Sequence, residues 1–145
     1  MPDAFAAPLR RTFSEEAELN DFAEAFAHRL RAGDVVALSG RLGAGKTTFV
    51  RAVVRALHGS DQTSSPTFTF WHRYAGVPPI DHLDLFRIEN PSETVELGLE
   101  DAFDGRSIVL VEWWEKAPHI VPAARYEVHI EGAGDSPRTV ECTRR

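Results

Sequence analysis

The residues with the clearest capacity for chemistry form a glycine-rich run that ends in a lysine and a threonine. Residues 40–47 are GRLGAGKT and match the pattern G-x-x-x-x-G-K-[ST]. Gly40, Gly43 and Gly45 allow the backbone to approach an anion with no Cβ in the way, and its N–H groups can then point at that anion. Lys46 would carry a charge to the β- and γ-phosphates, and the Thr47 hydroxyl would bind magnesium. The pattern predicts a phosphate-binding loop.

The segments on either side of this run support the prediction. Residues 35–38, Val-Val-Ala-Leu, form a short apolar run bounded by Gly33-Asp34 and Gly40, which is typical of a buried strand. Residues 47–57 carry apolar side chains at helical spacing and are followed by Gly59. The order of strand, glycine-rich loop and helix places the positive end of the helix dipole at the anion.

Hydrolysis of a bound nucleotide also requires a carboxylate near magnesium and a group that positions water. Glu112 directly follows the apolar run 108–111, so it should emerge at the carboxyl end of a strand beside the loop. Asp84 lies in a second strand-like segment, His-Leu-Asp-Leu-Phe-Arg. Periodicity alone leaves a second interpretation open for both acids, that of solvated residues at strand ends.

Three further features have a functional and a structural interpretation. Ser65, Pro66 and Thr67 lie in a polar loop after the predicted helix, where they could sense the γ-phosphate or form a plain turn. His82 could serve acid–base chemistry, although a lone histidine on a strand is more often a structural hydrogen-bonding residue. Trp113 and Trp114 are expected to be partly buried, at the border of the nucleotide or of a partner.

The remaining segments predict an α/β fold. Ser14 is expected to cap a helix that ends at Gly33, and acidic residues lie in the first turn. The segments 67–74 and 80–86 are predicted to be an antiparallel pair of strands, and short helical segments are expected at 92–97 and 99–103. The segments 126–131 and 138–143 should form a hairpin around a glycine-rich turn. Together these elements predict a P-loop NTPase-like mixed sheet with a parallel centre, antiparallel strands at one side and flanking helices.

The overall composition fits one domain, 1–145, in which residues 1–11 are expected to be loosely ordered. The chain has 145 residues, of which 43% are hydrophobic and 26% charged. The net charge of -6 argues against direct grip on nucleic acid, which depends on lysine and arginine. No apolar stretch approaches the roughly 18 residues of a membrane span. The single cysteine, Cys142, cannot form an internal disulfide, so a cytoplasmic location is expected.

Five short motifs, in one order, carry a family resemblance. They are GRLGAGKTTFVRA, SPTFTF, HLDLFRI, ELGLEDAFD and IVLVEWWEK. Over about residues 12–126 the chain resembles the TsaE family, the small ATPase of bacterial threonylcarbamoyladenosine synthesis. The resemblance implies ATP and Mg²⁺ as cofactors and the TsaB–TsaD complex as partner. It also implies that hydrolysis is slow without the partner, and that tRNA is met only indirectly, at the adenosine beside the anticodon of ANN-reading tRNAs.

The resemblance also implies roles for individual residues. Lys46, Asp84 and Glu112 would be the catalytic residues, and magnesium would lie at Thr47, Glu112 and Asp84. Ser65, Pro66 and Thr67 would form the nucleotide-sensing loop. The nucleotide would contact Leu42, Gly43, Ala44, Gly45, Lys46, Thr47, Thr48 and Trp113. The chain departs from the family at Trp114, where proline is usual, and at Phe86 and Arg41, where tyrosine and aspartate are common.

Three other functions fit the residues less well. A GTPase would carry an N-K-x-D motif, which is absent, so ATP is preferred. A small-molecule P-loop kinase, the main alternative, would need an arginine-bearing lid, and the segment 80–104 offers only Arg87. A binding subunit without turnover would not need a lysine, a threonine and two acids together.

Overall fold

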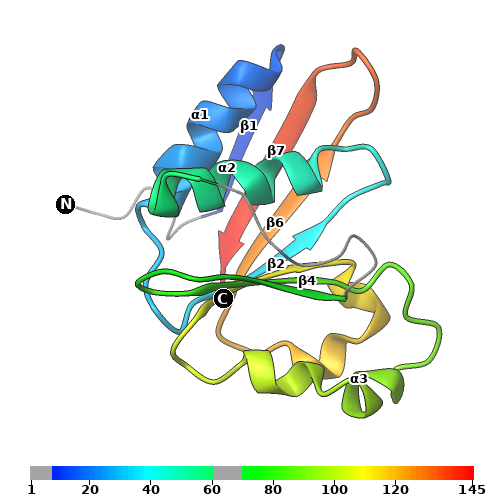
Figure 1. The fold of residues 1–145 in the computed structure, drawn as a ribbon. Coiled ribbons are helices and arrows are strands. Elements are labelled where there is room, and N and C mark those ends of the chain that lie inside the picture. The colour runs from blue at the N-terminus through cyan, green and yellow to red at the C-terminus, as the bar shows by residue number, and fades with distance from the viewer. Residues whose placement is uncertain (1–7, 61–69) are drawn as a thin grey trace.

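The computed structural model describes residues 8–60 and 70–145. Within them the chain alternates strands with helices and ends in a hairpin (Figure 1). The strands are β1 Leu9–Phe13, β2 Val35–Ser39, β3 Trp71–Tyr74, β4 Ile80–Asp84, β5 Ile108–Glu112, β6 Tyr126–Glu131 and β7 Arg138–Arg144. The helices are α1 Glu16–Ala27, α2 Lys46–His58 and α3 Glu93–Glu96, and the 3₁₀-helices are η1 Leu99–Ala102, η2 Trp114–Lys116 and η3 Pro118–Ile120.

The described strands form one mixed sheet in the order β1-β7-β6-β2-β5-β4-β3. The central strands β6, β2, β5 and β4 are parallel to one another. Antiparallel pairs flank them at both edges, β3 on β4 at one and β7 on β6 and β1 at the other. The mixed α/β class with a parallel centre is confirmed, but the antiparallel strands are not confined to one side. The second antiparallel edge exists because β6 pairs with β2, so its hairpin partner β7 extends the same sheet.

The N-terminal segment differs from the sequence-based expectation in three respects, the first of which is that α1 ends at Ala27 and not at Gly33. Leu9 to Arg11 are not loose, because they belong to β1, in which Leu9 lies opposite Cys142 of β7. Residues 1–7 lie outside the described residues. Helix α1 has Glu15 rather than Ser14 as its N-cap, with no side-chain capping bond. The predicted capping role of Ser14 is therefore wrong, since Ser14 belongs to the bend that leaves β1.

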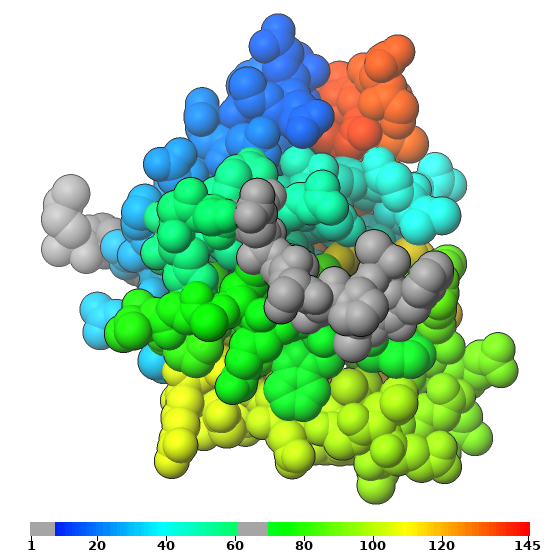
Figure 2. Space-filling model, viewed as in Figure 1, coloured from blue at the N-terminus to red at the C-terminus, as the bar shows by residue number. Residues whose placement is uncertain are grey.

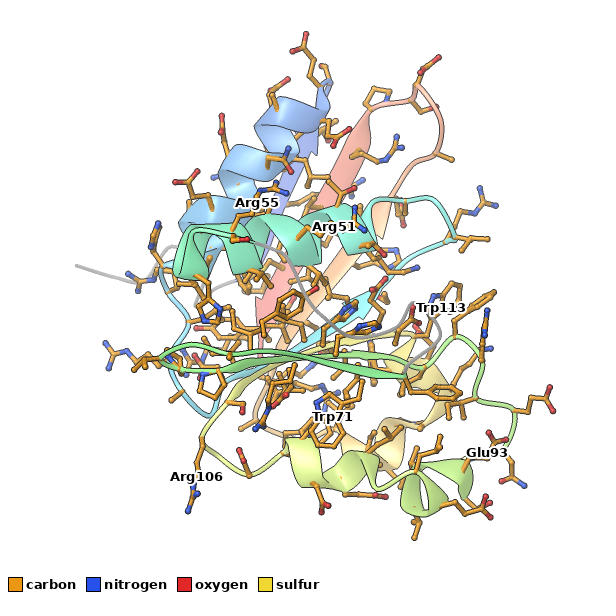
Figure 3. All side chains as sticks on the ribbon, viewed as in Figure 1. Arg51, Arg55, Trp71, Glu93, Arg106 and Trp113 are labelled. Atoms are coloured by element: carbon orange, nitrogen blue, oxygen red, sulfur yellow. The ribbon has the colours of Figure 1, made fainter. Side chains whose placement is uncertain are left out.

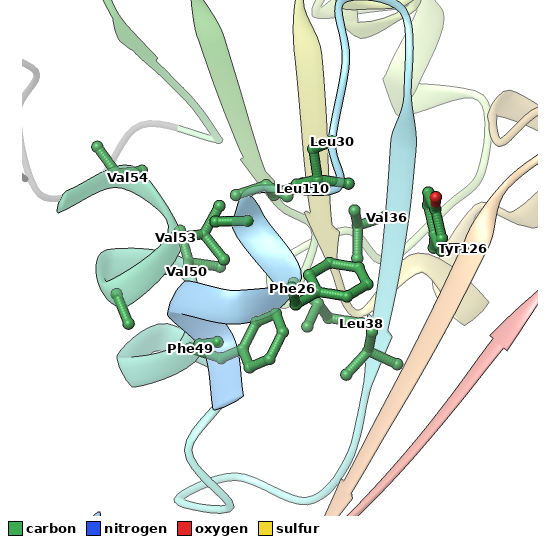
Figure 4. Packing of buried hydrophobic residues seen from close by; sticks show 14 of the residues in the cluster. Phe26, Leu30, Val36, Leu38, Phe49, Val50, Val53, Val54, Leu110 and Tyr126 are labelled. Carbon is green, nitrogen blue, oxygen red and sulfur yellow. The ribbon is translucent and has the colours of Figure 1, made fainter. Parts of the chain in front are cut away.

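Two apolar clusters cover opposite faces of the sheet. On one face α1 and α2 pack over β2, β5, β6 and β7 (Figure 4). Aromatic contacts join the two helices to the sheet there, with the Phe26 ring 5.6 Å from Phe49 and 5.2 Å from Tyr126. On the other face the α3–η1 and η2–η3 segments cover β2, β4 and β5. Since side chains alternate along a strand, every second residue of these strands faces α2.

Helix α2 presents one apolar and one basic side. Its apolar residues are buried in the cluster with α1, while Arg51 and Arg55 are exposed and project outward (Figure 3). In the space-filling view α2 forms a band between the α1 residues on one side and the green residues of β3 and β4 on the other (Figure 2). The helix ends as predicted at Gly59, which has φ 76°. Helix α2 is therefore anchored along its length, with its N-terminus at the carboxyl edge of the parallel strands.

Candidate functional site

The glycine-rich loop joins the end of β2 to the start of α2. Gly40, its first residue, has φ 142°, and a Cβ there would overlap the carbonyl oxygen of Ile130 on β6. Gly45, the N-cap of α2, has φ 114°. The close approach of β6 therefore adds a second reason for glycine at position 40, beyond the access to an anion that the sequence suggested.

Arg138 of β7 holds the outer side of the loop. Its Nε donates a hydrogen bond to the Ala44 carbonyl at 2.8 Å, and its Nη2 donates to the Gly43 carbonyl at 3.4 Å. The C=O and N–H of one peptide unit point in opposite directions, so the Gly45 N–H points away from Arg138. Sequence reasoning missed Arg138, because nothing local in the sequence links it to a loop about 94 positions earlier.

Lys46 is the first residue of α2 and is only 4% exposed. Its ammonium group donates to the carbonyls of Gly40 and Arg41, the latter at 3.1 Å, and lies 4.0 Å from the centroid of the Trp113 ring. Burial is the largest influence on the pKa of Lys46 and lowers it, while Glu112 acts in the opposite direction. A cation removed from water in this way interacts strongly with an anion that replaces its carbonyl partners.

Glu112 connects the start of α2 to the sheet. It is the last residue of β5 and is 3% exposed. The Thr47 hydroxyl donates toward both of its oxygens, at 3.3 and 3.4 Å, and His82 Nε2 lies 2.5 Å from its Oε2. Oxygen atoms of this kind, a hydroxyl beside a carboxylate, suit a hard cation such as Mg²⁺.

Asp84 lies beside Glu112. It ends β4, and the parallel register places it opposite Glu112 on β5. Both acids share the sheet face of Ile80 and Ile108, which is the face that α2 covers. Asp84 is more exposed than Glu112, and its Oδ1 accepts the backbone N–H of Phe86 at 3.0 Å. The two acids predicted from strand ends therefore meet at the phosphate loop.

Trp113 forms one wall of the site. Trp113 directly follows β5 and has a positive φ of 58°. Among the described residues, all the others with positive φ are glycines. Its ring lies 5.1 Å from that of Phe86, and Lys116 Nζ lies 5.9 Å from it. Figure 3 places Trp113 at the end of the sheet beside the loop. A strained backbone at this point aims the indole over Lys46, which is the kind of outlier that accumulates at functional sites.

A cavity of about 240 Å³ collects these side chains. Its lining consists of Leu42, Gly43, Gly45, Lys46, Thr47, Thr48, Asp84, Phe86, Glu112 and Trp113. A second cavity, of about 310 Å³, lies on the other side of the loop and shares Gly43, Gly45 and Thr48 with the first. Its other walls come from the β1–α1 junction and from the β6–β7 hairpin, including Arg138. The loop therefore lies between two neighbouring hollows at one edge of the sheet.

Most residues predicted for the site meet in the first cavity. The exceptions are Ala44, whose side chain is fully buried in the core so that only its backbone can serve, and residues 65–67, which lie outside the described residues. Phe86 was noted only as a departure from the family, yet it lines the cavity. Of His82's two interpretations, hydrogen bonding to Glu112 matches the structural one.

Residues 8–60 and 70–145 hold no group of three or more histidine, cysteine, aspartate or glutamate side chains that could bind a metal ion. A nucleotide-bound magnesium does not need such a group, since phosphates and water supply most of its ligands. None of the helices in the same residues combines the length and the apolar character needed to cross a membrane.

Strand β2, the glycine-rich loop and α2 follow one another in the order that a phosphate-binding loop requires. A family model described as "Threonylcarbamoyl adenosine biosynthesis protein TsaE" matches residues 13–140. The chain belongs to the TsaE family.

Individual relatives agree with this assignment. The chain is 39% identical to the Bacillus subtilis tRNA threonylcarbamoyladenosine biosynthesis protein TsaE over 134 residues, 92% of this chain and 83% of the relative. It is 37% identical to the Rickettsia bellii protein of the same name over 132 residues, 90% of this chain and 91% of the relative. The crystal structure of YdiB from Bacillus subtilis superposes with a TM-score of 0.77 at 31% identity, covering 97% of this chain and 87% of that one.

Proposed function

We propose that this chain is an ATPase that binds ATP with Mg²⁺ and acts on the TsaB–TsaD complex during threonylcarbamoyladenosine modification of tRNA. Relatives that carry the name of this biosynthesis support the pathway. The observation that carries the chemistry is the convergence of one buried cation, two threonine hydroxyls and two carboxylates on a single cavity beside a glycine-rich loop. Phosphoryl transfer needs such a set, because its catalysis consists mostly of positioning and charge stabilisation.

Each side chain has a role that follows from its surroundings. Lys46 exchanges the carbonyls of Gly40 and Arg41 for oxygens of the β- and γ-phosphates. Thr47 and Glu112 would hold the cation, and the more exposed Asp84 orients the attacking water. Magnesium held by these residues would supply positive charge that offsets the negative charge of the phosphates. Water attacks the γ-phosphorus, the bond to the β–γ bridging oxygen breaks, and ADP and phosphate leave.

In this proposal each of the two cavities binds a different part of the nucleotide. The γ-phosphate lies on the side of Asp84 and Glu112, where the acids and Lys46 are. The nucleoside lies in the 310 Å³ cavity, which begins at the same glycines and at Thr48 and widens toward Phe13. Thr48 lines both cavities and so lies where the phosphates would join the nucleoside.

The exposed residues at the rim of the 240 Å³ cavity are consistent with a protein partner. Leu42 is 72% exposed and Phe86 43% exposed, and both line the 240 Å³ cavity. Apolar residues at the mouth of a charged site are suited to burial under another protein, which would also exclude water from the reaction.

With a net charge of -6, the chain would meet tRNA only through TsaB–TsaD. A single cysteine fits work in the cytoplasm.

The test measures ATP binding by calorimetry, then ATP hydrolysis with and without TsaB–TsaD, and counts modified tRNA molecules per TsaD. We expect turnover to rise with the partner, and modification to pass one round only when ATP can be hydrolysed. Lys46→Ala should abolish both effects, while Arg51→Ala, an exposed cation on the same helix, should abolish neither. If ATP is consumed but modification is indifferent to the chain, the pathway assignment fails, and a phosphoryl acceptor should be sought as for a kinase.

A further inference from the structure

His82 makes a close contact with the candidate magnesium ligand that the reaction outlined above does not use. Its side chain is 9% exposed, and its Nε2 lies 2.5 Å from Oε2 of Glu112, whose side chain is 3% exposed. A carboxylate can only accept hydrogen bonds, so Nε2–H is the donor. Among the described residues, the other side-chain donor to this carboxylate is Thr47, at the longer distances of 3.3 and 3.4 Å.

The register between β4 and β5 brings His82 and Glu112 together. The register pairs His82 with Leu110 and Asp84 with Glu112, so His82 reaches Glu112 diagonally from two residues earlier on the neighbouring strand. On its other side His82 is paired across β3–β4 with His72, and the two rings stack at 5.9 Å. The imidazole is therefore held between an edge strand and Glu112, with little freedom to turn.

We propose that His82 is a positioning residue that fixes the Glu112 carboxylate for the cation–nucleotide complex. Thr47 has one hydroxyl proton, and its bonds to Glu112 are long, so Thr47 alone leaves the carboxylate free to rotate about its terminal torsion. A short bond from His82 to Oε2 fixes that torsion and keeps both carboxylate oxygens within reach of the Thr47 hydroxyl. Partners that orient a metal-binding carboxylate change metal affinity by about 10- to 100-fold when they are removed.

This inference rests on the proposed nucleotide site, and it makes a prediction that a purely structural histidine would not. Loss of a positioning bond should raise the apparent Kd for Mg²⁺. It should leave the affinity for the nucleotide unchanged when the metal is absent. Loss of a merely structural residue should lower both affinities together, because it would disturb the loop as well.

The experiment titrates Mg²⁺ into each variant at fixed ADP and reads nucleotide binding, and measures ADP affinity separately in EDTA. His82→Leu should raise the apparent Kd for Mg²⁺ about 10- to 100-fold with less than about twofold change in EDTA. His82→Gln, whose terminal amide can place a donor near the position of Nε2, should recover most of that loss. The side chain introduced by His82→Asn is shorter, so this variant should not recover the Mg²⁺ affinity.

A matched control is His58→Leu. His58 lies at the end of α2, and its Nε2 is 2.8 Å from the Pro78 carbonyl, so it is another partly buried, hydrogen-bonded histidine. This variant should leave the Mg²⁺ titration unchanged. Equal Mg²⁺ affinity in His82→Gln and His82→Asn would overturn the proposal even if His82→Leu does not fold. Failure of the unmodified chain to bind ADP at any Mg²⁺ concentration would instead overturn the nucleotide site itself.

Discussion

Asp81 is a buried carboxylate on the sheet face opposite the candidate site, and its ion pair with the half-exposed Arg73 is a sensitive point for stability. Its side chain is 0% exposed and accepts from Arg73 Nε at 2.8 Å and Nη2 at 2.9 Å. Trp71 Nε1 donates to Oδ1 at 2.8 Å; Figure 3 shows Trp71 below the sheet. Replacing Arg73 by methionine keeps an apolar stem and leaves a buried carboxylate without its countercharge.

The expected cost follows from what remains around the carboxylate. Removing one partner of a buried ion pair costs about 3–5 kcal/mol. Trp71 still donates to Asp81 in the variant, so the lower end applies, about 3 kcal/mol. For a chain of this size, 1 kcal/mol changes Tm by about 3–4 °C, so Arg73→Met should lower Tm by about 10 °C.

The cost should also depend on pH. Burial is the largest influence on the pKa of Asp81 and would raise it, but the hydrogen bonds, led by that from Arg73, outweigh burial and lower the pKa. A lowered folded-state pKa contributes stability that is present above the unfolded pKa, about 3.9, and is lost as the pH falls through the folded value. Without Arg73, burial should dominate and the pKa should rise, so the variant loses stability as the pH rises. The difference in unfolding free energy between the unmodified protein and Arg73→Met should therefore increase from about pH 3 to pH 7.

The assay is urea unfolding at several pH values, with Tm measured in parallel. Arg106→Met, which removes an exposed arginine on the same side of the sheet, serves as control and should change stability by less than about 0.5 kcal/mol. Asp81→Asn combined with Arg73→Met should be more stable than Arg73→Met alone at neutral pH, because no buried charge is left. A loss below about 1 kcal/mol, or a loss equal at both ends of the pH range, would refute the reasoning.

Four other substitutions test the site and its loop. Lys46→Ala should weaken ATP binding by at least about 100-fold, since charge-assisted bonds to phosphate are lost; unchanged affinity by calorimetry would show that the loop does not bind phosphate. Asp84→Ala and Glu112→Ala should lower kcat for hydrolysis more than ATP affinity, whereas equal losses in both would make these acids binding ligands only. Gly40→Ala should destabilise the fold by about 3 kcal/mol in urea unfolding, because its Cβ overlaps the Ile130 carbonyl, and a loss under about 1 kcal/mol would mean that β6 can move away.

Much of the site could be predicted from the sequence because its signals are local. The glycines at 40, 43 and 45, with the lysine and threonine that follow, specify a turn and a helix start within one segment. The apolar run ahead of Glu112 likewise predicted a strand end there, and β5 does end at that residue. Spacing within one element is set by backbone geometry alone, so no knowledge of distant residues was needed.

Helix ends and strand edges were predicted less well. Ser14 has the chemistry of an N-cap, but the pairing of Leu9–Phe13 with β7 places it in a bend instead. The sequence also contains the hairpin of β6 and β7, yet nothing in it indicates that β6 joins β2. Such pairings depend on which apolar faces are buried together, a property of the whole sheet.

By itself, then, the sequence determined the glycine-rich loop, the fold class and the residue types of the candidate site. Only the tertiary structure decided which side chains touch: Glu112 with Thr47 and His82, and Arg138 with the loop. The physical reason is that strand order and register place residues far apart in the chain on one face. A shift of one residue in the β4–β5 pairing would turn Asp84 or Glu112 to the opposite face and dismantle the site.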